Sequence, residues 1–223
     1  MGTVQLFLAD ARELAAKEAE SLSLLTAKRR AEAVSFRVEG ARLLCCAAGL
    51  LLRKVLGVTQ DKELTFGPLG KPSLACGGVE FSLSHAGHYA ALAVSSQNVG
   101  IDVEPIKPPS VLPRKMFTKA ELDWLAAHPE GESFCLLWTR LESALKAEGC
   151  GLAVECRAFS LLEPGDPWYW ESMILDGHLF TCSAQSPVEL QPVVLSAGDL
   201  LREGLTDPPF GGKPPADDVV STN

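Results

Sequence analysis

The chain has 223 residues, of which 47% are hydrophobic and 22% charged, and its formal net charge is −8. This length supports one large core or two smaller ones, and the composition is typical of a globular protein rather than a fibrous one. The acidic balance argues against a nucleic-acid-binding protein. No apolar run approaches the roughly 18–20 residues that span a membrane, so no membrane partner is expected.

The N-terminal residues and the cysteines predict a cytoplasmic location. Charged residues begin at Asp10 and Arg12, without the basic, apolar and small-residue segments of a secretory signal. The seven cysteines are an odd number, and none forms a CxxC pair. We therefore expect small buried thiols in a reducing compartment, not a disulfide framework or a zinc site.

The first half of the chain predicts a strand, then helices, then strands. The expected elements are a strand at 4–7, helical pattern over 11–33, an apolar helix over 41–56 that ends at Gly57, a turn-rich stretch at 66–72, and strands at 79–84, 89–95 and 99–104.

The second half repeats helices and strands after a proline-rich loop. Helices are expected at 121–127 and 132–147, and strands at 158–162, 169–175, 178–183 and 193–195. We therefore predict an α+β fold with two similar α+β halves, residues 1–104 and 105–206, and mostly antiparallel sheets. Residues 207–223 have few apolar anchors, and we expect a disordered tail.

Two acidic residues alternate along the strand expected at 99–104. Ile101 and Val103 should face the core, so Asp102 and Glu104 should lie side by side on the opposite face. Such a carboxylate pair suits Mg²⁺, which binds one or two carboxylates together with substrate phosphates. A solvated edge strand with two surface acids explains the same pattern.

Three further motifs each have a functional and a structural interpretation. On a helix, Glu142 and Lys146 lie one turn apart. Glu142 could bind a metal and Lys146 a phosphate, or the two could form an ordinary ion pair. Ser84 and His85 end a strand, where they suit an anion or a simple turn. Thr118-x-x-Glu121 is a capping box, which explains Glu121 without a catalytic role.

Basic residues are concentrated near the N-terminus. They form a patch for an anionic ligand or cover solvated helix faces. The set comprises Lys28, Arg29, Arg30, Arg37, Arg42, Arg53 and Lys54.

Taken together, the order and spacing of these motifs resemble the Sfp-type 4′-phosphopantetheinyl transferases of the holo-acyl-carrier-protein synthase superfamily. The resemblance runs from about residue 28 to about residue 185. The matching segments are Gly70-Lys71-Pro72, Phe81-x-x-Ser84-His85, Gly100-Ile101-Asp102-Val103-Glu104, Phe117-Thr118-x-x-Glu121, and Trp138-x-x-x-Glu142-Ser143-x-x-Lys146 followed by Gly149-x-Gly151-Leu152.

The resemblance implies a pseudo-twofold pair of α+β halves with the coenzyme A site in the cleft between them. It implies Mg²⁺ ligands at Asp102, Glu104 and Glu142, and a lysine beside the pyrophosphate at Lys146. The positions implied for coenzyme A are Lys71, Pro72, Ser84 and His85, with Lys28, Arg37 and Arg42 from the basic N-terminal region.

The implied reaction moves the phosphopantetheine arm of coenzyme A to a serine of an apo acyl or peptidyl carrier protein and releases 3′,5′-ADP. Mg²⁺ and Lys146 would neutralise charge that develops on the phosphates. Either Glu121 or Glu142 could take the proton of the serine, directly or through a metal-bound water. A monomer is expected.

Some residues depart from the family pattern. Leu141 replaces the usual lysine, Ser82 replaces asparagine, Ala86 stands where serine is frequent, and Gly40 or Ala41 stands at the aspartate of the N-terminal motif. We expect a lysine at 141 to lie at the flank of the site in solvent. Because Leu141 leaves one positive charge near the site missing, it favours an alternative, a catalytically decayed module that binds coenzyme A or a carrier protein. A structural protein with incidental surface acids is the third hypothesis.

Overall fold

The computed structural model describes residues 2–151, 159–165 and 167–204. The elements in chain order are β1 (Gly2–Asp10), η1 (Ala11–Lys17), α1 (Glu18–Ser23), α2 (Ala27–Ser35), α3 (Glu39–Leu56), η2 (Asp61–Glu63), β2 (Leu64–Phe66), β3 (Pro72–Leu74), β4 (Glu80–Ala86), β5 (Tyr89–Ser95), β6 (Val99–Pro105), η3 (Arg114–Met116), α4 (Lys119–Ala127), α5 (Gly131–Glu148), β7 (Tyr169–Leu175), β8 (His178–Ala184), β9 (Val188–Val194) and α6 (Ala197–Leu201). The η elements are 3-10 helices.

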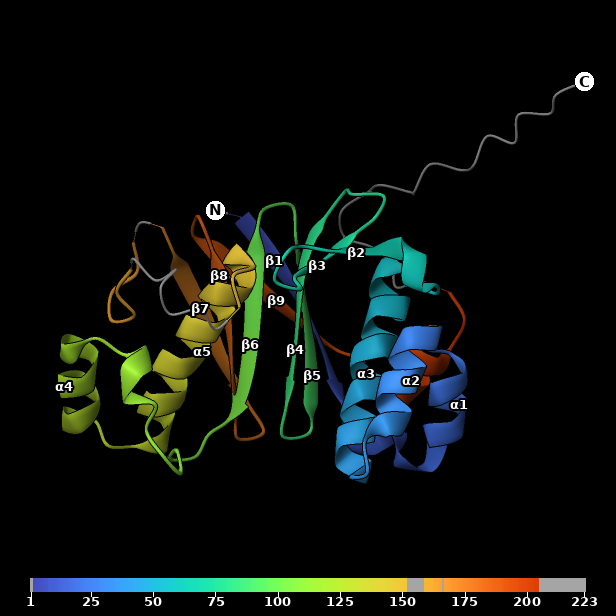
Figure 1. The fold of residues 1–223 in the computed structure, drawn as a ribbon, viewed down its shortest axis with the longest axis horizontal. Coiled ribbons are helices and arrows are strands. Elements are labelled where there is room, and N and C mark those ends of the chain that lie inside the picture. Colours follow the sequence, from blue (N-terminus) through green and yellow to red (C-terminus); the bar gives the residue numbers. More distant parts are fainter. Residues whose placement is uncertain (1, 152–158, 166, 205–223) are drawn as a thin grey trace, which may run out of the picture.

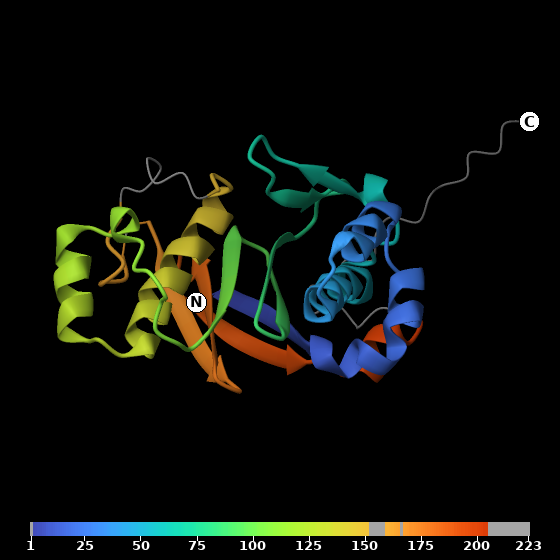
Figure 2. The ribbon, with the colours of Figure 1, turned by 60° about the horizontal axis from the view of Figure 1, so that its bottom comes forward.

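Two sheets face each other, and each is covered on its outer side by one long helix (Figure 1). The first sheet has the strand order β4-β5-β1-β9, and α3 packs against it. The second has the order β6-β8-β7, and α5 packs against β6 and β8. The second view shows the same layers, with the helices outside and the strands between them (Figure 2). The α+β class predicted from the sequence is confirmed.

Side chains on both faces of the central strands are buried, because helices and strands cover both sides. Along β1, Phe7 and Ala9 pack in the cluster with α3. Leu6 and Leu8 point the other way, into the cluster between the two sheets. This double burial explains the nearly continuous apolar run of β1, which would be expected only of a strand with two covered faces.

The two sheets divide the chain differently from the expected ranges. The expected boundary between residues 104 and 105 falls inside β6, which pairs antiparallel with β8 of the second sheet. β9 lies in the expected C-terminal range, yet it pairs parallel with β1 of the first sheet. The ranges 1–104 and 105–206, and the pseudo-twofold relation between them, remain proposals.

Several elements differ from those expected. The helical pattern over 11–33 is broken into a 3-10 helix and two α-helices, and residues 159–162 form no strand. β2 and β3 form a short hairpin across the turn-rich stretch, with Phe66 opposite Pro72. Ala158 and the expected tail from residue 207 lie outside the described residues. None of the described helices is long and apolar enough to cross a membrane.

Candidate active site at β6 and α5

The acidic side chains of β6 lie on the face predicted from their alternation. Ile101 and Val103 are buried between the sheets, and Asp102 is on the opposite face, beneath α5. The Asp102 side chain is only 2% exposed. The alternative of a solvated edge strand is therefore wrong for Asp102, because its carboxylate is buried.

Gly100 explains how α5 can approach β6 so closely. A Cβ atom at Gly100 would collide with the backbone carbonyl of Ser143 on α5. The absence of a side chain at 100 therefore sets the distance between the strand and the helix. This contact brings Asp102 and the α5 side chains into one site.

Buried hydroxyl groups fix the position of α5 on β8. Thr139 and Thr181 share a hydrogen bond of 2.7 Å between their hydroxyl oxygens. One turn later, the hydroxyls of Ser143 and Ser183 are 2.5 Å apart. All four side chains are buried, so their partners must be internal. These pairs orient the helix that carries Glu142 and Lys146.

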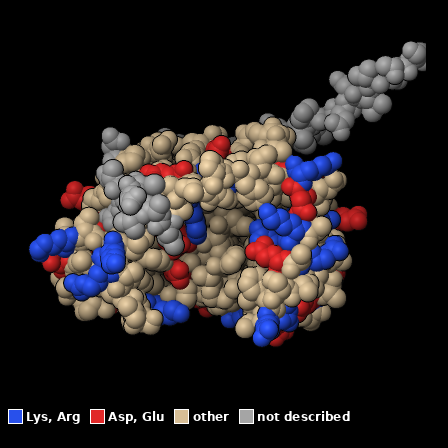
Figure 3. Space-filling model, in the orientation of Figure 1, with Lys and Arg blue, Asp and Glu red and all other residues tan. Residues whose placement is uncertain are grey.

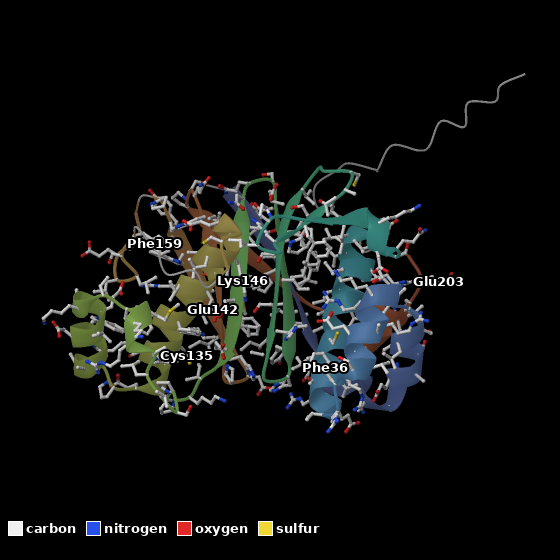
Figure 4. All side chains as sticks on the ribbon, viewed as in Figure 1. Phe36, Cys135, Glu142, Lys146, Phe159 and Glu203 are labelled. Carbon is white, nitrogen blue, oxygen red and sulfur yellow. The ribbon has the colours of Figure 1, made fainter. Side chains whose placement is uncertain are left out.

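Lys146 joins the strand and helix contributions. Its ammonium donates to Asp102 Oδ1 at 2.5 Å and to the Ser84 hydroxyl at 2.8 Å. The Ser84 hydroxyl donates in turn to Asp102 Oδ1 at 2.9 Å. Glu142 lies one turn before Lys146, with 3.7 Å between Glu142 Oε2 and Lys146 Nζ. Figure 4 shows Glu142 and Lys146 on neighbouring turns of α5.

The carboxylates of this site lie in a desolvated environment and repel one another. Burial raises the pKa of Asp102, although Lys146 and Ser84 oppose the shift. Burial and the charge of Asp102 raise the pKa of Glu104. The same two effects raise the pKa of Glu142 to about 7. The charges of these three acids and of Lys146 therefore influence one another.

The donor set suits a hard cation such as Mg²⁺. In the described residues, Asp102 Oδ2 is buried and has no hydrogen-bond partner. Carboxylate oxygens are the protein ligands that Mg²⁺ prefers. As the side chains stand, no three His, Cys, Asp or Glu residues of the described chain already converge as a metal site. The assignment of a Mg²⁺ site therefore rests on the unpaired Asp102 Oδ2 and on the mutual repulsion of the three carboxylates.

A pocket with a volume of about 170 Å³ lies beside Lys146. The residues Leu69 to Pro72 of the β2–β3 hairpin form one wall, and Leu145, Lys146 and Gly149 form the other. Phe81, Ser82 and Leu83 of β4 also line it. The space-filling view shows a hollow between the two lobes (Figure 3).

The structure brings Ser84, His85, Lys71 and Pro72 to this region. Ser84 contacts Asp102, and Lys71 and Pro72 line the pocket. His85 follows Ser84 on β4. Desolvation lowers the pKa of His85, and the charges of Arg29 and Lys146 lower it further. His85 is thus close enough to Arg29 of α2 and Lys146 of α5 for their charges to lower its pKa.

Arg29 is a candidate that sequence reasoning did not single out. It lies next to Lys28 on α2, and its charge acts on His85. Its guanidinium also pairs with Glu32 at 3.0 Å. The basic run from 28 to 30 was the available signal, but helix periodicity alone did not show which member faces the cleft.

The other basic residues have mixed surroundings. Lys28 lies over the Phe66 ring, with 4.5 Å from its ammonium to the ring centroid. Arg42 binds Glu18 at 2.8 Å and also donates to the backbone carbonyl of Arg37. The side chain of Arg37 itself is exposed. Arg42 is therefore engaged in structural contacts, and the binding of an anionic ligand by these residues remains a prediction.

Glu121 lies in a buried capping box, as its local motif predicts. Its Oε2 accepts the backbone N–H of Thr118 at 2.8 Å, and its Oε1 accepts that of Leu161 at 2.9 Å. The side chain is 1% exposed. Both carboxylate oxygens therefore hold backbone amides, which accounts for Glu121 structurally.

Leu141 belongs to the core, which corrects the expected place of a lysine there. It is 1% exposed and packs in the cluster with Leu137 and Trp168. A lysine at 141 would not lie in solvent beside the site, because this face of α5 is covered. The departure from the family pattern at 141 therefore removes no charge from the solvent-lined site.

We expect Leu141→Lys to lower the free energy of unfolding by about 3 kcal/mol, because an ammonium would enter an apolar cluster. Urea unfolding followed by circular dichroism measures the loss. Leu141→Met is the matched control, since it keeps the volume and should cost less than about 1.5 kcal/mol. Wild-type stability of the lysine variant, together with tighter coenzyme A binding, would restore the flank hypothesis.

Comparison with known proteins shows a partial similarity to one enzyme family. Residues 98–188 match the model of the 4′-phosphopantetheinyl transferase superfamily. The chain is 36% identical over 97 residues to the 4′-phosphopantetheinyl transferase Sfp of Bacillus subtilis, which covers 41% of this chain and 43% of the relative. It is 33% identical over 119 residues to the 4′-phosphopantetheinyl transferase gsp of Aneurinibacillus migulanus, covering 49% and 50%.

A putative 4′-phosphopantetheinyl transferase of Synechocystis is 31% identical over 115 residues, covering 47% of this chain and 46% of the relative. The matches therefore span half or less of the length of these curated relatives. The superfamily match contains Asp102, Glu142 and Lys146, the residues that β6 and α5 bring together. Residues 98–188 thus resemble the 4′-phosphopantetheinyl transferase superfamily, in agreement with the family that the motifs predicted.

Proposed function

We propose that this protein transfers the phosphopantetheine arm of coenzyme A to a serine of an apo carrier protein. The observation that carries the proposal is the ammonium of Lys146 between the buried Asp102 and Ser84, at the edge of a pocket. The names of the similar proteins support the same reaction. An anionic pyrophosphate would meet a preorganised cation there.

The reaction balances as a phosphoryl transfer. The serine oxygen of the carrier forms a bond to the β-phosphorus of coenzyme A, and the bond from that phosphorus to the bridging oxygen breaks. The bridging oxygen leaves as part of 3′,5′-ADP, and the serine proton passes to a base. Lys146 would stabilise the charge that develops on the oxygens during this transfer.

We assign the proton-accepting role to Glu142 rather than to Glu121. Both oxygens of Glu121 accept backbone N–H groups in the core. Glu142 is partly exposed at 19% and lies close to Lys146. A base needs access to the substrate hydroxyl, which favours the side chain that reaches the site.

Asp102, Glu104 and Glu142 would hold Mg²⁺ in this proposal. The ion would supply charge neutralisation for the pyrophosphate. The unpaired Asp102 Oδ2 supports this assignment. The 3′-phosphate of coenzyme A would face His85, Arg29 and Lys28. Pro72 would contact the nucleotide beside the hairpin.

The acceptor would be an acyl or peptidyl carrier protein, and the enzyme would act as a monomer in the cytoplasm. The decayed-module alternative depended on Leu141. Because Leu141 packs in the core, it provides no reason to expect a loss of activity. The full set of Asp102, Glu142 and Lys146 favours an enzyme.

The test is incubation with coenzyme A, Mg²⁺ and purified apo acyl or peptidyl carrier proteins, followed by intact-mass measurement. The expected result is a gain of one phosphopantetheine arm on the carrier. A carrier with its acceptor serine changed to alanine is the matched control, and a chelator should stop the reaction. Binding of coenzyme A without transfer to any carrier would favour the binding module instead.

A further inference from the structure

Lys71 connects two parts of the molecule that are far apart in the sequence. It directly precedes β3 in the β2–β3 hairpin. Its ammonium donates to the backbone carbonyl of Ala147 at 2.7 Å and to Asn98 Oδ1 at 2.5 Å. Ala147 lies in the last turn of α5, and Asn98 directly precedes β6. The hairpin reaches toward this end of α5 in both ribbon views (Figures 1 and 2).

The contact suits a structural clamp for three reasons. Carbonyls in the last turn of a helix lack partners within the helix, and a cation there also interacts favourably with the helix dipole. The stem of Lys71 lies against Gly149, where an added Cβ would be 3.1 Å from Lys71 Cδ. The stem and the ammonium are therefore both held in place, unlike those of a surface lysine.

The two parts that Lys71 joins are the two walls of the pocket. Leu69 and Gly70 belong to the hairpin wall, whereas Lys146 and Gly149 belong to the α5 wall. The side chain of Lys71, from the hairpin wall, hydrogen-bonds to the backbone of the α5 wall. Loss of this bond would let the hairpin separate from the helix and widen the pocket.

We propose that Lys71 is a positioning residue that fixes the distance between the pocket walls, and that its ammonium does not bind a coenzyme A phosphate. This role replaces the direct phosphate contact implied by the family resemblance. The clamp itself is inferred from the contacts of Lys71. Only the identity of the bound nucleotide rests on the proposed function.

The decisive experiment compares coenzyme A with 3′-dephospho-coenzyme A as ligands of Lys71→Met. Methionine keeps most of the stem and removes the ammonium. A clamp predicts that Kd and KM rise by the same factor for both ligands, about tenfold, as for a lost hydrogen bond to a charged group. The turnover number should change much less, because Lys146 and Asp102 are intact. Asn98→Ala should weaken both ligands in the same way but to a smaller extent.

Lys62→Met is the matched control, since Lys62 is an exposed lysine near the same hairpin. It should leave both affinities unchanged. A loss in Lys71→Met that is confined to coenzyme A would identify a 3′-phosphate contact and overturn the clamp. Unchanged affinity for both ligands would overturn it as well.

Hydrogen exchange without ligand separates the clamp from the proposed function. The clamp predicts faster amide exchange over residues 64–74 in Lys71→Met than in the wild type or in Lys62→Met. If the wild type binds neither ligand, the proposed function fails, yet faster exchange would still support the clamp. Unaltered exchange in that case would exclude it.

Discussion

Replacing Asp102 by asparagine should lower carrier modification by a factor on the order of 10² or more, with the chain still folded. Asparagine has nearly the same shape, and its oxygen can still accept from Ser84 and Lys146. The negative charge is lost, and with it the proposed ligand for Mg²⁺. Burial raises the pKa of Asp102, because a charged carboxylate is less well solvated in the folded protein than in water. The charge is therefore expected to serve function rather than stability.

Three measurements test this expectation. Turnover is measured by intact mass of the carrier at saturating Mg²⁺, and stability by urea unfolding, which should change by less than about 2 kcal/mol. Calorimetry with and without chelator should show Mg²⁺-assisted coenzyme A binding in the wild type and a weaker effect in Asp102→Asn. Asp123→Asn is the matched control, because Asp123 pairs with Lys119 on the exposed surface of α4. Near wild-type turnover of Asp102→Asn would remove Asp102 from the site.

Short-range patterns in the sequence predicted much of the fold. The alternation along β6 placed Ile101 and Val103 inside and Asp102 on the opposite face, because strand geometry has a period of two. Gly57 ends α3 with φ of 72°, as its role as a helix C-cap predicts. The capping box of Thr118 and Glu121 is also confirmed. Each of these features depends on residues that are close in the sequence.

The remaining features depend on contacts between distant residues. Nothing near Leu141 in the sequence shows that its face of α5 meets Trp168. Nothing near Lys71 shows that its ammonium will meet the end of α5, 76 positions later. The return of β9 to pair with β1 is a further long-range contact. Composition and periodicity do not encode such pairings directly, so these predictions failed or were not made.

The candidate site shows the same division. The sequence pattern predicted which carboxylates and which lysine would be available, and the family motifs predicted that they act together. Neither the sequence pattern nor the motifs predicted that Lys146 would hydrogen-bond Ser84 on β4 as well as Asp102 on β6. Those bonds depend on Gly100, whose missing side chain lets α5 approach the strand. The tight contact, rather than the residue types alone, concentrates the charges.

Lys146→Met should reduce the turnover number by a factor on the order of 10² or more, because a preorganised charge beside the reacting phosphate is lost. It should also lower the free energy of unfolding, by about 1–3 kcal/mol, since the buried Asp102 carboxylate loses its cation. Lys146 is 32% exposed, which places the expected loss below that of a fully buried pair. A stability effect alone would therefore not establish a catalytic role.

A double-mutant cycle with Asp102→Asn separates the two effects. In Lys146→Met combined with Asp102→Asn, no unpaired carboxylate remains, so stability should recover by about 1–3 kcal/mol relative to the sum of the single changes. Turnover should stay low, because neither charge is restored. The control cycle uses Lys119→Met and Asp123→Asn, an exposed pair at 2.6 Å, whose coupling should be at most about 0.5 kcal/mol. If turnover recovered together with stability in the double variant, Lys146 and Asp102 would be a structural ion pair, and the proposed role of Lys146 in catalysis would be wrong.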